Sequence, residues 1–215
     1  MVGEPVIATN SGVNLLIGNN PDANGGYTSK VASFEAESTL DEATRDQAAF
    51  RKATGYIVAH PATSLVNAAK KYAHFFSSES FLLVSQFAAE SPDPSMSLAK
   101  RYASVPLLAT VLVNGLYAIV LVGGWLGLLV SARNRLWYVT VSLLLSFLCI
   151  HLVTFAGSRF HFPLMPFFVL FAVQTMTNGK NIFGSLSKVQ WALFVVGVSS
   201  LLSVWGVEAM IIARS

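Results

Sequence analysis

The chain has 215 residues, a formal net charge of +3 and a hydrophobic content of 53%, so its length alone would allow one or two soluble domains. The charge is divided unevenly: residues 1–101 hold eight Lys and Arg against ten Asp and Glu, whereas residues 102–215 hold six Lys and Arg against one acid, Glu208. The later basic residues stand at the ends of apolar runs, where membrane topology and lipid headgroups explain them. This balance gives no support to nucleic-acid binding, and Cys149, the single cysteine, excludes an internal disulfide.

Two short apolar stretches near the start of the chain predict strands. Val6–Ala8 and Val13–Ile17 are separated by the turn-forming cluster Asn10-Ser11-Gly12. No positively charged segment followed by an apolar stretch precedes them, so no secretory signal is visible. If the polar half of the chain lies outside the membrane, we expect the chain to be the C-terminal part of something longer.

Residues 18–27 predict a structured loop rich in Asn and Gly. Asn, Asp and Gly tolerate left-handed backbone, and Pro21 fixes the entry to a turn. Two interpretations stay open: a plain surface connection, or a loop whose polar groups face a sugar or a lipid headgroup. The residues that would then contact a donor or an acceptor are Asn14, Asn19, Asn20, Asp22 and Tyr27.

Two helices are predicted to follow. Thr39-Leu40-Asp41-Glu42 has the capping-box pattern of a helix start, and Pro61 disfavours helical geometry at His60, which sets the end. The second helix should start at Pro61. Its apolar stripe is formed by Leu65, Ala69, Tyr72, Ala73 and Phe76, and its polar face carries Lys70, Lys71 and His74. Such a helix either lies in a membrane interface or packs as an ordinary soluble helix.

Four apolar segments in the second half predict membrane-spanning helices, because about 20 helical residues cross a hydrocarbon core. The first domain therefore covers residues 1–101 and ends at the break Ser91–Ser95, and the second covers residues 102–215. The predicted fold class is an all-α integral membrane protein with a small, mainly helical extracytoplasmic N-terminal region that contains short strands. The four expected spans are Val105–Val130, Leu136–Ala156, Phe162–Thr177 and Val189–Ala213.

The short loops between spans predict the orientation. Arg133 and Arg135 lie between spans one and two, and Lys180 and Lys188 lie between spans three and four. By the positive-inside rule this side is cytoplasmic, so the polar half lies outside. If every basic residue that flanks a span is counted, the two sides of the membrane carry equal numbers, because Lys100, Arg101, Arg159 and Arg214 lie on the other side.

The stretch Gly157–Pro166 contains the residues that best suit ligand chemistry. Arg159 is permanently charged and can hold a phosphate through two parallel donors; the alternative is an arginine that extends to the lipid headgroups. His161 is a second candidate for binding a lipid phosphate, and the alternative for it and for His151 is a hydrogen-bonded structural histidine. Glu208 is predicted to be an interfacial charge.

Motifs for other chemistries are missing from the sequence. It contains no Walker-type phosphate loop, nucleophile elbow, dinucleotide fingerprint or His-Glu-x-x-His motif, and its histidines lack the spacing of metal ligands. It therefore identifies no cofactor and no metal residues, and it leaves a divalent metal ion open. A small transporter, the third interpretation, lacks paired broken helices and acids within the spans.

Two stretches together resemble a known superfamily. The first runs from Asn10-Ser11-Gly12-Val13-Asn14 through Gly18-Asn19-Asn20-Pro21 to Gly25-Gly26-Tyr27, and the second is Arg159-Phe160-His161-Phe162-Pro163-Leu164-Met165-Pro166. They resemble the extracytoplasmic segment and a hairpin of bacterial GT-C membrane glycosyltransferases, relatives of dolichyl-phosphate-mannose protein mannosyltransferases and aminoarabinose transferases of family 39. The helices from Arg45 to Phe76 also look like that superfamily.

The resemblance implies a glycosyltransferase, a hexosyl or pentosyl transferase of the bacterial cytoplasmic membrane. It would move a sugar from a polyprenyl-phosphate carrier to a glycan, lipid or protein acceptor outside the cell. A carboxylate would deprotonate the acceptor hydroxyl, and cations would stabilise the departing phosphate. Arg159 is the residue that the resemblance assigns to the carrier phosphate, with His161 in place of the motif's second arginine.

One part of the superfamily's pattern is not matched. Its catalytic acid lies in a loop after the first membrane helix, and nothing here corresponds to that loop. The expectation is therefore a C-terminal portion of such an enzyme, inactive alone unless another chain supplies the N-terminal half. The alternative is a non-catalytic membrane scaffold or assembly subunit.

Overall fold

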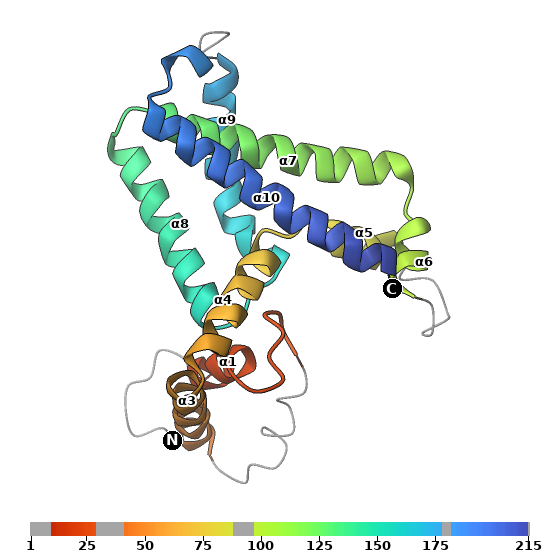
Figure 1. Ribbon diagram of the computed structural model, residues 1–215, viewed down its shortest axis with the longest axis vertical. Coiled ribbons are helices and arrows are strands. Elements are labelled where there is room, and N and C mark those ends of the chain that lie inside the picture. Colours follow the sequence, from red (N-terminus) through yellow and green to blue (C-terminus); the bar gives the residue numbers. More distant parts are fainter. Residues whose placement is uncertain (1–9, 29–40, 88–96, 178–181, 215) are drawn as a thin grey trace. The chain divides into compact units, whose positions relative to one another are not determined.

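The computed structural model of the chain describes residues 10–28, 41–87, 97–177 and 182–214. Within these ranges every regular element is a helix, which confirms the all-α prediction (Figure 1). In chain order the elements are α1 (Ser11–Gly18), α3 (Glu42–Ala59), α4 (Pro61–Phe75), α5 (Ser80–Phe87), α6 (Leu98–Ala103), α7 (Leu107–Val130), α8 (Arg135–Val153), η2 (Ser158–Leu164), α9 (Met165–Thr177), η3 (Phe183–Ser185) and α10 (Lys188–Arg214).

Four helices are long and apolar enough to cross a membrane, as the sequence predicts. They are α7, α8, α10 and the segment Ser158–Thr177, in which the 3₁₀ turn η2 runs directly into α9. Their lengths of 24, 19, 27 and 20 residues match the need for about 20 residues per span. The third span begins four residues earlier than expected because η2 accommodates Pro163. These four helices are consistent with a multi-pass integral membrane protein.

The helices group into two compact units. Unit 1 comprises Met1–Phe75 and Leu145–Phe160, and unit 2 comprises Phe76–Leu144 and His161–Ser215. Helix α8 thus contributes its C-terminal half to unit 1 and its beginning to unit 2. These units are groups of residues that contact one another. The boundary expected near residue 101 instead divides an extracytoplasmic region from a membrane region, and it stays a prediction.

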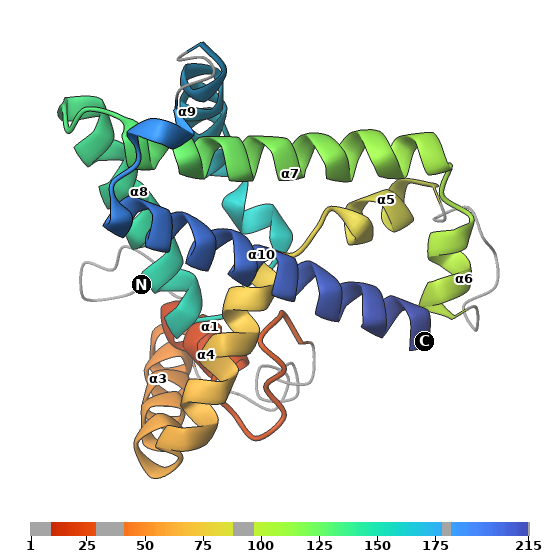
Figure 2. The same cartoon turned by 45° about the horizontal axis from the view of Figure 1, so that its top comes forward.

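Unit 2 is organised around α7, which packs closely against α9 and also contacts α10. The hydroxyl of Thr175 in α9 donates to the carbonyl oxygen of Gly123 in α7 at 2.9 Å. The indole Nε1 of Trp125 donates to the carbonyl oxygen of Leu193 in α10 at 3.2 Å. Figure 2 shows α10 running along α7, with the short helix α6 beside the C-terminal end of α10. Such interhelical hydrogen bonds and small residues are typical of helix packing in lipid.

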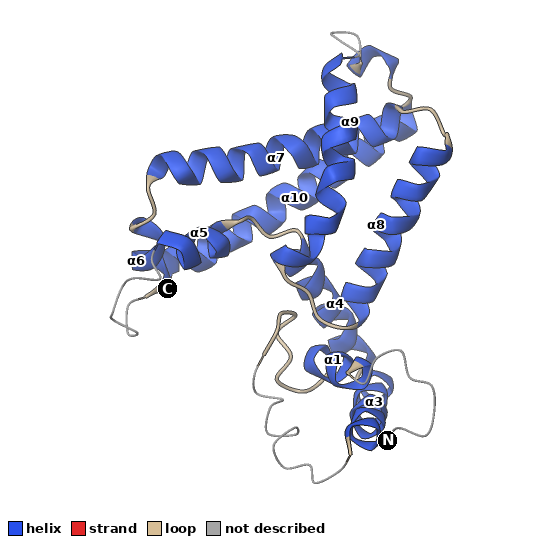
Figure 3. Cartoon of the chain, turned by 180° about the vertical axis from the view of Figure 1, so that it is seen from behind, coloured by secondary structure: helices blue, strands red, loops and turns tan. Residues whose placement is uncertain are grey.

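The prediction of a strand at Val13–Ile17 is wrong, because these residues belong to α1 and the described part of the chain has no strand (Figure 3). A short apolar run cannot by itself separate a strand from a helix buried on most sides. The carboxylate of Asp46 in α3 supplies what a helix start needs: its Oδ1 accepts the backbone N–H groups of Gly12 (2.7 Å) and Val13 (3.1 Å). The other expected strand, Val6–Ala8, lies outside the described residues.

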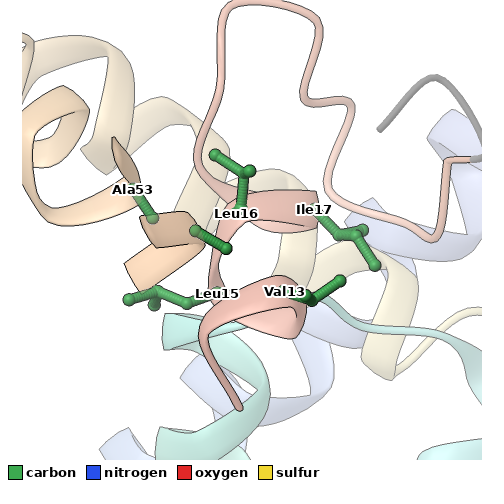
Figure 4. Packing of buried hydrophobic residues seen from close by; sticks show 6 residues of the cluster. Val13, Leu15, Leu16, Ile17 and Ala53 are labelled. Carbon is green, nitrogen blue, oxygen red and sulfur yellow. The ribbon is translucent and has the colours of Figure 1, made fainter. Parts of the chain in front are cut away.

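Helix α1 forms the core of unit 1 by packing against α3. Figure 4 shows Leu15 and Leu16 of α1 on the side of the helix toward Ala53 of α3, with Val13 and Ile17 of the same buried cluster on the other side. Ala49 and Ala53 are fully buried, so their small side chains let the two helices approach closely. The cluster therefore depends on a short helix whose polar start is capped by its neighbour.

Helices α3 and α4 begin and end close to the expected positions. His60 is the C-cap of α3, and α4 starts at Pro61, as predicted. The N-cap of α3 is Asp41, whose side chain accepts the N–H of Thr44; Thr39, the expected cap, lies outside the described residues. Hydrogen bonds from Thr44 lower the pKa of Asp41.

The buried face of α4 differs from the predicted apolar stripe. The residues it buries are Asn67, Lys71 and Phe75, which recur every fourth position, whereas Leu65 is 74% exposed. Hydropathy misplaces this face because Lys71 finds hydrogen-bond acceptors inside unit 1. Leu65 and Val66 are exposed apolar side chains on α4. The location of α4 in a membrane interface stays a prediction.

We expect Gly127→Ala to destabilise unit 2, because a Cβ at this position would overlap the carbonyl oxygen of Phe171 in α9. The expected loss is about 1–3 kcal/mol of unfolding free energy, the usual cost of overpacking. Thermal unfolding in detergent, followed by circular dichroism, measures it. Gly115→Ala is the matched control in the same helix, since nothing lies within 4 Å of its Cβ position. Equal stability of the two variants would contradict the close α7–α9 contact.

Candidate functional site

The loop after α1 and the segment after α8 are hydrogen bonded to each other in unit 1. The side-chain Nδ2 of Asn19 donates to the carbonyl oxygen of Val153, 134 residues away, at 2.7 Å. The backbone N–H of Ala156 donates to the carbonyl oxygen of Gly25 at 3.0 Å. Gly25 has a φ of 95°, a conformation that glycine adopts without strain. The Asn- and Gly-rich loop is therefore fixed in unit 1 by hydrogen bonds to the end of α8 and the residues after it.

Lys71 of α4 lies at the centre of this junction. Its ammonium donates to Oδ1 of Asn19 and to the carbonyl oxygen of Val153, each at 3.0 Å. Val153 is the last residue of α8, where the helix dipole favours a positive charge. The side chain is almost fully buried, with 1% of the residue exposed, and burial lowers the pKa of Lys71 from 10.5 to about 8. One lysine thus joins α4, the loop and the end of α8.

Arg159 is exposed at the start of η2 and lies against an aromatic stack. Its guanidinium carbon is 5.1 Å from the centroid of the Phe160 ring. That ring is stacked on His151, with centroids 4.2 Å apart and planes inclined by 19°. Nδ1 of His151 lies 3.0 Å from the carbonyl oxygen of Phe155, so His151 has the hydrogen bond expected of a structural histidine. Within the described residues no carboxylate forms an ion pair with Arg159.

The loop residues that the sequence singles out divide into buried and exposed groups. Asn19 and Asn20 are buried, and Nδ2 of Asn20 donates to the carbonyl oxygens of Leu16 and Ile17 at the end of α1. Asn14 is half-buried in α1. Asp22 and Tyr27 are exposed, and the Tyr27 ring meets the edge of Phe155 with centroids 5.7 Å apart. This arrangement gives Asn19 and Asn20 structural partners and leaves Asp22 and Tyr27 facing outward.

His161 lies in unit 2 and is buried there. Its Nε2 is 3.0 Å from Oε1 of Glu79, and its ring is stacked on Tyr117 with centroids 4.9 Å apart. His161 and Glu79 expose only 1% and 4% of their surface. The second oxygen of Glu79 has no hydrogen-bond partner among the described residues. A buried carboxylate of this kind needs a cationic or protonated partner, and His161 is placed to be that partner.

Glu208 of α10 is hydrogen bonded to the segment that precedes α5, and its interfacial location stays a prediction. Its Oε2 accepts the backbone N–H of Ser78 at 2.8 Å, and its Oε1 accepts the Ser78 hydroxyl at 2.9 Å. The Ser78 hydroxyl also contacts the Ser80 hydroxyl. Asn114 of α7 accepts the neighbouring N–H of Glu79 at 3.1 Å. Residues 78–80 therefore link two spanning helices of unit 2 through hydrogen bonds.

Lys71, Glu79 and Ser78 are site residues that sequence reasoning missed. Lys71 stands on the face of α4 that hydropathy assigns to solvent. Glu79 stands within Ser77-Ser78-Glu79-Ser80, a polar interruption between two apolar segments, and this interruption is a signal that could have found it. Among the described residues, no group of three or more His, Cys, Asp or Glu could hold a metal ion.

Comparison with protein-family models, with curated proteins and with solved structures finds no match to this chain.

We expect the stability of unit 1 to rise with pH between about 8 and 10.5 because of Lys71. In this window the folded lysine has lost its proton while the unfolded lysine keeps it, so raising the pH favours folding. Chemical denaturation in detergent at several pH values measures the slope. Lys71→Met should remove it, and the exposed neighbour Lys70 provides the control variant Lys70→Met. An unchanged slope in Lys71→Met would contradict the burial of this ammonium.

Proposed function

We propose that the chain is the carrier-binding portion of a membrane glycosyltransferase of the GT-C superfamily. In this role Arg159 contacts the phosphate of a polyprenyl-phosphate-linked sugar. The observation that carries the proposal is the junction in unit 1. The two stretches that resemble the superfamily are far apart in the sequence, yet the first is hydrogen bonded to the residues that lead into the second.

The setting of Arg159 supports a contact with phosphate. Arg159 is exposed, and its guanidinium makes a cation–π contact with the Phe160 ring that restrains its position. A guanidinium held in this way can donate two parallel hydrogen bonds to phosphate oxygens. As the bond between the sugar carbon and the phosphate oxygen breaks, this positive charge would stabilise the negative charge that develops on the leaving phosphate.

The neighbouring residues supply position rather than chemistry in this proposal. His151 supports the Phe160 ring, and Lys71 holds the end of α8 from which the Arg159 segment departs. His161 is engaged with Glu79 in unit 2, so the proposal does not depend on it. In this proposal the general base that deprotonates the acceptor hydroxyl is the superfamily's catalytic acid. It lies in the loop after the superfamily's first membrane helix, to which no part of this sequence corresponds.

The proposed setting is the bacterial cytoplasmic membrane, with the N-terminal region outside. The four spans and the two basic pairs that flank them support this orientation. The acceptor would be a glycan, a lipid or a protein, and an N-terminal half with the catalytic carboxylate would come from outside the matched segments. No nucleic acid is part of this role.

We expect the purified chain in detergent to bind farnesyl phosphate, a short polyprenyl phosphate, saturably and more tightly than the uncharged farnesol. Arg159→Ala should weaken the binding of farnesyl phosphate by about tenfold or more, because a hydrogen bond to a charged group contributes ~1.5–3 kcal/mol. Isothermal titration calorimetry measures both affinities.

The control variant is Arg133→Ala. The guanidinium of Arg133 also lies over an aromatic ring, that of Trp137 at 5.7 Å, but in the short loop between α7 and α8. Its removal should leave the affinity unchanged. Equal binding by wild type and Arg159→Ala would favour the non-catalytic scaffold over the glycosyltransferase.

A further inference from the structure

Unit 2 contains a cavity of 460 Å³ whose described lining residues do not include Arg159, and the proposed sugar transfer gives it no role. It is bounded by α6, the first half of α7, the C-terminal part of α10, Ser78 just before α5 and Ser80 at the start of α5. Its volume lies within the range of small-molecule sites. Most of its wall is apolar, with a few polar groups that converge on it, which is the usual composition of a ligand site.

Among the described residues that line the cavity, Glu208 carries the only charged side chain, and none of them is basic. Ser78 fixes the carboxylate through its N–H and its hydroxyl, one on each oxygen. A carboxylate can accept about four hydrogen bonds, so capacity remains for a ligand. An anion in a mainly apolar wall is costly to leave without a cation, and the chemistry of the site therefore favours a positively charged group.

Three aromatic residues line the same cavity as this carboxylate. Trp205, Tyr117 and Tyr102 all line the cavity, and the rings of Trp205 and Tyr117 have centroids 6.1 Å apart. The indole of Trp205 is fixed because its Nε1 donates to the carbonyl oxygen of Phe76 at 3.0 Å. Asn114 donates to the Tyr102 hydroxyl at 3.3 Å, which restrains that ring. Ring faces attract cations, and aromatic rings beside a carboxylate are the arrangement that recognises organic ammonium groups.

The cavity lies near the ends of two spanning helices. Glu208 is six residues before the end of α10, which corresponds to ~9 Å at the α-helical rise of about 1.5 Å per residue. Asn114 is seven residues after the start of α7, or roughly 10 Å. With the ends of these candidate spans at the membrane interface, a lipid headgroup would reach this depth.

We propose that this cavity binds an alkylammonium group, with Glu208 as its counter-ion and Trp205, Tyr117 and Tyr102 as its aromatic wall. Such a group occurs on the ethanolamine headgroup of a membrane lipid and on water-soluble primary amines. The apolar wall would accommodate the carbon chain next to the amine.

The test uses the full chain in dodecyl maltoside at pH 7 and isothermal titration calorimetry with two pairs of probes. The first pair is hexylammonium chloride and hexanol, which share a carbon chain and differ in charge. We expect saturable binding of hexylammonium and at least tenfold weaker binding of hexanol. Equal affinities in the wild-type protein would overturn the proposal, and this comparison needs no variant.

The second pair identifies the source of the amine. Dihexanoyl phosphatidylethanolamine carries the ammonium group, and dihexanoyl phosphatidylglycerol does not. Selective binding of the ethanolamine lipid supports a lipid ligand. Binding of hexylammonium without binding of the ethanolamine lipid supports a water-soluble amine and overturns the lipid source.

Glu208→Gln keeps the size of the side chain and removes its charge. We expect it to weaken hexylammonium binding by about tenfold or more and to leave the weak binding of hexanol unchanged. Glu42→Gln, at the start of α3 in unit 1, is the control and should bind as wild type does. Hexylammonium affinity within twofold of wild type in Glu208→Gln would overturn the role of this carboxylate.

Discussion

The constraint on which both units depend is that a polar group buried away from water must have a partner. Lys71 meets this constraint in unit 1 by donating to Asn19 and to the end of α8. In unit 2, Glu79 meets it through His161 and Glu208 through Ser78. Each of these pairs connects elements that are distant in the sequence. These polar pairs therefore add specific contacts between distant elements to the apolar packing that brings α1 against α3 and α7 against α9.

The spans are the part of the fold that the sequence predicts best. A helix that crosses a bilayer must satisfy its own backbone and needs about 20 apolar residues, so α7, α8 and α10 are visible in composition alone. Helix α1 is not visible in this way. The residue that caps its first turn, Asp46, lies in another helix, and the short apolar run around Leu16 is equally compatible with a strand.

The candidate sites show the same limit. Arg159 can be singled out from its local setting, because an arginine followed by two prolines between spans is a local pattern. Lys71 cannot, since its partners come from the loop and from α8, and hydropathy places it on the exposed face of α4. The cavity beside Glu208 needs residues from four segments, so it exists only once the helices of unit 2 have packed.

The central claim is that Lys71 and Asn19 hold the loop against the end of α8. The most direct measurement is a double-mutant cycle with Lys71→Met, Asn19→Ala and the double variant, using unfolding free energies in detergent at pH 7. Because the two side chains share a hydrogen bond at 3.0 Å, we predict a coupling energy of about 1 kcal/mol or more. Additive effects of the two substitutions would contradict the account.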